Sequence, residues 1–272
     1  MGITPHHHGI SVRDLAAWRA AIAPLGFTVP EPGAETPRHY ANVDGDPIGR
    51  MIARSLGDEI FTHYIENPAT GQQIDLVQIA GRSLVARPSD APAQGDTTIG
   101  IPVAGPYSAY AAMKAAAPAF DFSPPDDADG EDGVAFTVDG QAIVLLRSGE
   151  PFTLVHYSES GWLIARRWYE ELLGLPVDEI QGSCGVERYR LGGVAARVEF
   201  AVSAATVVPP AGAGKKYPGA NHFRIVGLDL AAAAKRIDAS GVGAWLFPPR
   251  GRFAQVFGPT NEFIELYDAA VA

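Results

Sequence analysis

Residues 7–27 read HHGISVRDLAAWRAAIAPLGF, which is a short apolar strand, an acidic residue and an amphipathic helix in succession. Asp14 stands where a helix N-cap belongs, and Gly26 stands where a helix commonly ends. Residues 222–242 read HFRIVGLDLAAAAKRIDASGV and repeat this order. In both stretches, 7 residues separate the histidine from the aspartate and 12 separate the aspartate from the glycine. This match predicts an internal repeat, which decides how the rest of the chain is divided.

Two weaker copies of the unit lie between these stretches. One starts with the strand TIGIPV at residues 98–103 and the other with FTLVH at residues 152–156, and a helical pattern follows each. After each helix the sequence changes to period-two apolar alternation broken by Gly and Pro, which is typical of short strands joined by turns. We therefore predict an α+β fold of four β-α-β-β-β modules. The predicted modules span residues 1–85, 96–150, 151–208 and 217–272.

The composition excludes several classes of protein. The chain has 272 residues, of which 47% are hydrophobic and 19% charged, and its formal net charge is −10. An acidic surface repels phosphate backbones and anionic lipid, so we expect no nucleic-acid and no membrane partner. A single cysteine, Cys184, allows neither an internal disulfide nor a zinc-cysteine site. We expect a cytoplasmic monomer or homodimer. The sequence contains no phosphate-loop, nucleophile-elbow or dinucleotide-binding motif.

Three features together resemble the vicinal oxygen chelate superfamily. They are the strand start His-x-Gly-Ile at His7, the Asp-capped helix that ends in Leu-Gly-Phe, and the strand PATGQQIDL at residues 68–76. That superfamily includes glyoxalase I, bleomycin-resistance proteins, methylmalonyl-CoA epimerase and extradiol dioxygenases. The resemblance implies two curved-sheet barrels, each made from two modules, with a divalent metal ion inside a sheet cavity.

The resemblance also implies where the metal ligands lie. They come from the start of the first strand and from an acidic position in the last strand of a module, which here are His7 and Asp75 in module one and His222 and Glu265 in module four. Two imidazoles with one or two carboxylates suit one divalent ion of Fe, Mn, Co, Ni or Zn. The corresponding positions of module two hold Thr98 and Val144, and module three offers Thr153 or Leu154.

The pairing of modules determines whether these ligands meet. If neighbours in sequence pair, neither half holds two histidines at the ligand positions. If module one pairs with module four, His7, Asp75, His222 and Glu265 converge, and modules two and three form a structural half. We predict the second arrangement.

The predicted site also indicates which residues bind the substrate and which act in catalysis. Strand alternation places Gly9, Gln73 and Arg224 beside the ligands, and Gln73 and Arg224 are the predicted substrate-binding residues. The resemblance implies that a ligand carboxylate, Glu265 or Asp75, acts as the catalytic base. We therefore predict a metal-dependent, glyoxalase-like lyase or isomerase that acts on a small oxygen-chelating substrate.

Two alternatives remain open. His156, His222 and Glu265 follow one another in an order that resembles the two-histidine-one-carboxylate triad of extradiol dioxygenases, which predicts an Fe(II) ring-cleaving enzyme instead. The third class is a metal-free binding protein that resembles bleomycin-resistance proteins and uses its aromatic residues to line the pocket.

Overall fold

The computed structural model describes eight segments of the chain, and the bounds of every element below refer to these residues. The described segments are residues 6–29, 59–80, 91–128, 132–183, 185–208, 219–242, 245–260 and 262–268. Cys184 lies outside them. No helix in these segments is both long and apolar enough to cross a membrane.

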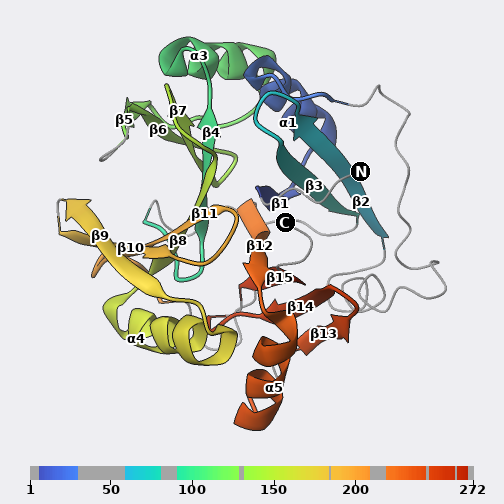
Figure 1. The fold of residues 1–272 in the computed structure, drawn as a ribbon. Coiled ribbons are helices and arrows are strands. Elements are labelled where there is room, and N and C mark those ends of the chain that lie inside the picture. The colour runs from blue at the N-terminus through green and yellow to red at the C-terminus, as the bar shows by residue number, and fades with distance from the viewer. Residues whose placement is uncertain are drawn as a thin grey trace.

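One curved sheet is built from strands of modules one and four. It has 7 strands in the order β13-β14-β15-β12-β1-β3-β2, so module one lies beside module four (Figure 1). The join is the antiparallel pair of β1 and β12, in which Gly9 lies opposite His222. The strands are β1 (His7–Val12), β2 (Glu59–Asn67), β3 (Gln72–Ala80), β12 (Gly219–Leu228), β13 (Trp245–Arg250), β14 (Phe253–Phe257) and β15 (Phe263–Asp268).

The second curved sheet is built from modules two and three. It has 8 strands in the order β5-β6-β7-β4-β8-β11-β10-β9, joined by the antiparallel pair of β4 and β8. The predicted pairing of module one with four and of two with three is therefore confirmed. The strands are β4 (Thr97–Pro102), β5 (Asp126–Asp127), β6 (Gly133–Val138), β7 (Gln141–Leu146), β8 (Phe152–Tyr157), β9 (Val177–Ser183), β10 (Val186–Leu191) and β11 (Arg197–Val202).

The two repeated helices have the predicted ends. Asp14 caps α1 (Leu15–Ile22) by accepting a hydrogen bond from the Ala17 N–H, and Asp229 caps α5 (Leu230–Ser240) in the same way through the Ala232 N–H. A short 3₁₀ turn, η1 (Ala23–Leu25), continues α1 to Gly26. Gly26 at φ 88° and Gly241 at φ 68° end the two helices in the left-handed conformation that glycine adopts without strain.

The remaining helical segments are α3 (Pro106–Ala116) in module two and α4 (Glu159–Arg167) in module three. A π-helical segment, η2 (Trp168–Leu173), extends α4. Sequence periodicity predicts one continuous helix over α4 and η2, and it does not indicate that η2 is π-helical.

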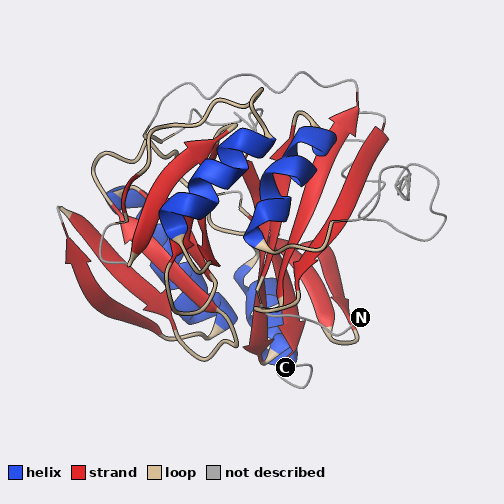
Figure 2. Ribbon diagram, turned by 90° about the horizontal axis from the view of Figure 1, so that it is seen from above, coloured by secondary structure: helices blue, strands red, loops and turns tan. Residues whose placement is uncertain are grey.

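The two largest hydrophobic cores join modules that do not share a sheet. One contains residues of modules one and two only, and the other contains residues of modules three and four only. A third, smaller core lies between modules two and three. Helix α1 packs on α3 (Figures 1 and 2), and α5 packs on η2. Because apolar residues such as Ile10 and Ile225 point toward these cores, the alternate residues of the first sheet point to its other face. That face carries the candidate site.

Candidate metal centre

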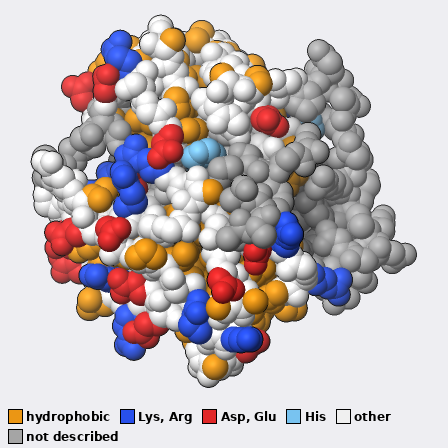
Figure 3. Space-filling view, in the orientation of Figure 1, with side chains coloured by type: hydrophobic (Ala, Val, Ile, Leu, Met, Phe, Trp, Pro, Cys, Tyr) orange, Lys and Arg blue, Asp and Glu red, His pale blue; other side chains and the backbone are white. Residues whose placement is uncertain are grey.

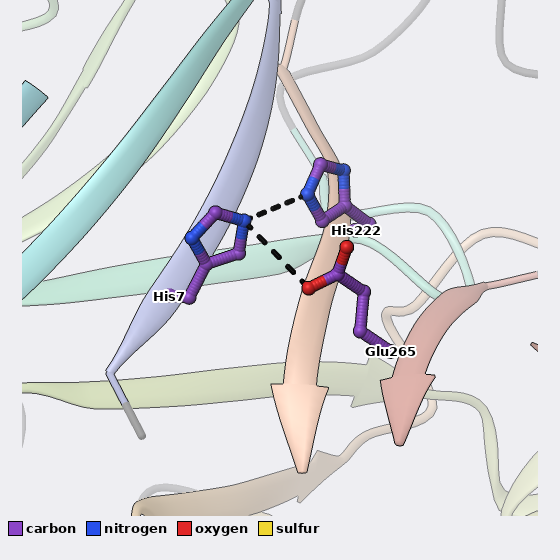
Figure 4. A group of neighbouring side chains, drawn as sticks. All are labelled: His7, His222 and Glu265. Carbon is purple, nitrogen blue, oxygen red and sulfur yellow. Dashed lines mark hydrogen bonds and ion pairs between the residues drawn. The ribbon is translucent and has the colours of Figure 1, made fainter. Parts of the chain in front are cut away.

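Three predicted ligands, His7, His222 and Glu265, meet on the inner face of the first sheet. The Nε2 atoms of His7 and His222 are 3.0 Å apart, and His7 Nε2 lies 4.0 Å from Glu265 Oε2 (Figure 4). One ligand atom from each of the three residues lies within 4.8 Å of the others. All three residues are buried. Two imidazole nitrogens and one carboxylate oxygen in this arrangement can hold a divalent metal ion.

Sheet register explains why residues so distant in sequence meet. Gly9 pairs with His222 across β1 and β12, and Arg224 pairs with Glu265 across β12 and β15. Side chains two residues apart share a face of a strand, so His7 lies on the face of Gly9, and His222 on the face of Arg224. The three functional groups therefore project to the same side from three adjacent strands.

Burial controls the protonation of both histidines. Loss of solvent lowers the pKa of His7 well below 6.5, the charges of His222 and Arg224 lower it further, and a hydrogen bond with Gln73 acts in the opposite direction. Burial also lowers the pKa of His222, although the negative charge of Glu265 opposes this effect. Neutral imidazole is the form that binds metal, so the donor set fits a divalent ion.

Glu265 is held in place by two neighbours. Its Oε2 accepts hydrogen bonds from Nε and Nη2 of Arg224 at 3.0 and 2.9 Å, and its Oε1 accepts one from Nε2 of Gln255 at 3.2 Å. Arg224 also lies over the Tyr267 ring, 4.8 Å from its centroid. Arg224 thus orients a candidate ligand, a role that the sequence did not predict, and its role in substrate binding stays a prediction.

Asp75 is the predicted ligand that the structure does not bring into this group. It is buried on β3, opposite Gly9 of β1 and on the same face as His7. Its carboxylate is not among the ligand atoms within 4.8 Å of one another. Gln73, also on β3, lies beside His7 and donates a hydrogen bond to Glu66. Asp75 is therefore placed next to the centre, and its part in metal binding stays a prediction.

The alternative ligand His156 lies in the other sheet. Its Nε2 is 2.8 Å from Oγ1 of Thr98, in the strand pair that joins modules two and three. His156 is absent from the metal-binding group found among the described residues. The triad of His156, His222 and Glu265 is therefore not assembled, because the modules that carry His156 and His222 pair with different partners.

Module three differs from the prediction at one position, and it holds an acidic residue that was not predicted. Glu265 pairs with Arg224, and the equivalent pair between β11 and β8 is Glu199 with Leu154. The position that corresponds to His222, two residues earlier in the first strand, is therefore Phe152 and not Thr153 or Leu154. Glu199 was not predicted, although the acidic residue within the apolar sequence VEFAV of the last strand could have indicated it.

Comparison with known proteins identifies the fold. No protein-family model and no curated protein matches the sequence. Glyoxalase I from Zea mays has a similar structure, with a TM-score of 0.59 and 14% identity over 98% of this chain and 92% of that chain. A proposed dioxygenase from Bacillus subtilis has a TM-score of 0.58 and 16% identity over 99% of this chain and 85% of that chain. The chain has the fold of these two structures, the vicinal oxygen chelate fold.

Proposed function

We propose that this protein is a metal-dependent enzyme that acts on a small organic substrate through two of its oxygen atoms. The observation that carries the proposal is the convergence of His7, His222 and Glu265 on one face of the first sheet. Three protein ligands leave further coordination positions for substrate oxygens. A divalent ion bound there would act as a Lewis acid and stabilise negative charge on a substrate oxygen.

We further propose redox-neutral proton transfer, as in a lyase or isomerase. Glu265 is restrained by Arg224 and Gln255, so it suits a fixed ligand better than a carboxylate that leaves the metal and takes a proton. Asp75 is buried on β3, next to the strand β1 that carries His7 and on the same face as His7, so it is the better candidate for the base. A buried carboxylate next to the substrate would receive the proton that leaves carbon.

A second candidate is an Fe(II) dioxygenase, and one observation favours it. The residues within 4.8 Å of one another are two histidines and one glutamate, which is the ligand set of many non-haem iron oxygenases. The histidine from module one, His7, would replace His156 in this triad.

Metal analysis tests the part of the proposal that both candidates share. We expect about one divalent ion per chain in the wild-type protein, and loss of most of it in His222→Ala. His63→Ala is a matched control, since His63 is also buried but is not a member of the group. Full metal content in a His7→Ala, His222→Ala double variant, checked for folding by circular dichroism, would contradict the proposal.

An oxygen electrode separates the two candidate reactions. Redox-neutral chemistry predicts turnover without O₂ consumption and a large loss of kcat in Asp75→Asn with metal content largely kept. Stoichiometric O₂ uptake by the Fe(II)-loaded protein with a catechol, unaffected by Asp75→Asn, would instead establish the dioxygenase.

A further inference from the structure

Helix α4 carries apolar side chains on the face that is exposed to solvent. Leu163 and Ile164 are 69% and 62% exposed, which makes them the two most exposed large hydrophobic side chains of the described residues. Trp162 and Ala165 of the same helix are buried in the core of modules three and four. The described helices α1, α3 and α5 expose no large aliphatic side chain. The solvent face of α4 is therefore more apolar than its packing within one chain requires.

Two valines extend this exposed apolar area. Val207 and Val208, which follow β11, are 41% and 56% exposed. Gln94 links them to α4, because its N–H donates to the Val207 carbonyl at 2.8 Å and its Oε1 accepts from Oγ of Ser158, the N-cap of α4, at 2.6 Å. Adjoining exposed apolar side chains commonly mark an interaction site, whereas single ones do not. The four members of this α4 patch are Leu163, Ile164, Val207 and Val208.

Charged residues on both sides of Leu163 make this face complementary to a second copy of itself. Glu159 and Arg167 lie four residues before and four residues after Leu163, so the three side chains follow one stripe of the helix. Arg167 is 74% exposed and pairs with Glu171 one turn later. If two copies of α4 pack antiparallel about a two-fold axis at Leu163, Glu159 of each copy lies opposite Arg167 of the other. Parallel packing would instead bring equal charges together.

The place of α4 in the molecule permits this contact. Figure 1 shows the helix at the outer edge of the molecule, and Figure 3 shows hydrophobic side chains among acidic and basic ones in that region. Because the chain has a net charge of −10, two copies repel each other at long range. A face that combines apolar side chains with charges of both signs therefore suits self-association better than the acidic remainder of the chain.

From this arrangement we propose that the α4 patch is the interface of a weak homodimer, in which two copies of α4 pack antiparallel about a two-fold axis. The apolar side chains supply the buried area. The charges fix the orientation, since exposed ion pairs add specificity more than affinity. Four aliphatic side chains form a smaller centre than permanent dimers bury, so the dimer dissociates at low protein concentration. The interface uses no residue of the candidate metal centre and does not depend on the proposed reaction.

Sedimentation velocity of the full chain tests the interface. We expect the average sedimentation coefficient to rise toward that of a dimer between about 5 and 500 μM protein, with a dissociation constant on the order of 100 μM. Leu163→Asp should keep the protein monomeric over this range, because it would bury an unpaired charge. Val242→Asp is the matched control, since Val242 is an aliphatic side chain that is 58% exposed outside the α4 patch.

Charge reversal tests the antiparallel arrangement. Glu159→Arg and Arg167→Glu should each weaken the dimer about tenfold or more, because like charges then face each other. An equimolar mixture of the two variants should associate again, since every contact between the two different variants pairs opposite charges. Arg147→Glu is the control, because Arg147 is also an exposed arginine in an ion pair, with Asp132. It should leave association unchanged.

Three results would overturn the proposal, provided that circular dichroism finds each variant folded. The first is a wild-type chain that stays monomeric at the highest concentration. The second is a dimer that Leu163→Asp does not weaken, because the interface would then lie elsewhere. The third is a mixture of Glu159→Arg and Arg167→Glu that stays monomeric, because these two residues would then not face each other.

Discussion

The contact between Arg224 and Glu265 shows how one residue determines the geometry of the candidate centre. Arg224→Lys keeps the positive charge but loses the fork that donates twice to Oε2. We expect metal affinity to fall about 10- to 100-fold, as is typical when a residue that orients a ligand is lost. Competition with a fluorescent chelator measures this change. Arg13→Lys alters another ion pair, with Asp139, and should leave the affinity unchanged.

Glu199 gives a second prediction at the level of single residues, concerning pH. Burial alone would raise its pKa, but hydrogen bonds from Arg197, Arg188 and Arg190 outweigh burial and lower the pKa from 4.5 to about 2. A lowered pKa stabilises the folded state above pH 4.5, and this contribution, of order 3 kcal/mol, is lost as the pH falls toward 2.

Urea unfolding of the wild type and of Glu199→Gln between about pH 1.5 and 7, a range that brackets both pKa values, measures this contribution. The free energy of unfolding should differ most at neutral pH, and the difference should shrink on acidification. A difference that stays constant over this range would contradict the pKa shift.

The spacing of residues in the sequence predicted only some of the residues discussed above. His7, His222 and Glu265 followed from two strongly similar copies of one unit, so their positions could be counted. Glu199 could not be found in this way, because module three has Phe152 where module four has His222. The placement of Asp75 relative to the centre depends on side-chain position, which spacing does not determine.

At the scale of elements, the sequence predicted the ends of the two repeated helices correctly. An Asp N-cap satisfies an N–H within three residues, and glycine relieves left-handed strain, so both signals are local. The π-helical segment η2 differs because a distant residue stabilises it. Arg236 of α5 donates Nε and Nη2 hydrogen bonds to the Leu172 and Leu173 carbonyls, at 2.9 and 2.7 Å. The local sequence of η2 does not indicate that Arg236 is its partner.

The caps allow a matched prediction in the two repeated helices. Asp14→Ala and Asp229→Ala should each lower the free energy of unfolding by about 1 kcal/mol, because one N–H at the start of the helix loses its acceptor. Asp14→Asn and Asp229→Asn are the controls, since asparagine also caps well. Chemical denaturation checks the four variants. Equal losses in the Ala and Asn variants would assign the effect to charge rather than to capping.

At the scale of the whole molecule, the four modules form a closed cycle of contacts. Sheets join one to four and two to three, whereas the two largest hydrophobic cores join one to two and three to four. Local periodicity predicts the strands but not their partners, because β1 could pair with a strand of module two or with a strand of module four. The prediction succeeded through the ligands, since only the pairing of one with four unites His7 and His222.

This cycle predicts a single cooperative unfolding transition, because no module can leave without breaking both a sheet junction and a core. Met113 is fully buried in the core of modules one and two, and Ile237 lies in the core of modules three and four. Met113→Ala and Ile237→Ala should each lower the free energy of unfolding by about 2 to 5 kcal/mol. Two probes can follow the transition, namely far-UV circular dichroism for the whole chain and tryptophan fluorescence.

Fluorescence weights this test toward modules three and four, which hold three of the four tryptophans. Of the four tryptophans, Trp18 lies in module one, and Trp162, Trp168 and Trp245 lie in modules three and four. Met113→Ala, in module two, should therefore shift the fluorescence midpoint as much as the circular dichroism midpoint. If most of the fluorescence change keeps its wild-type midpoint while the circular dichroism midpoint falls, the core that holds Trp162 and Trp168 unfolds independently of the core that holds Trp18 and Met113. The sheet junctions between β1 and β12 and between β4 and β8 then do not couple the two cores.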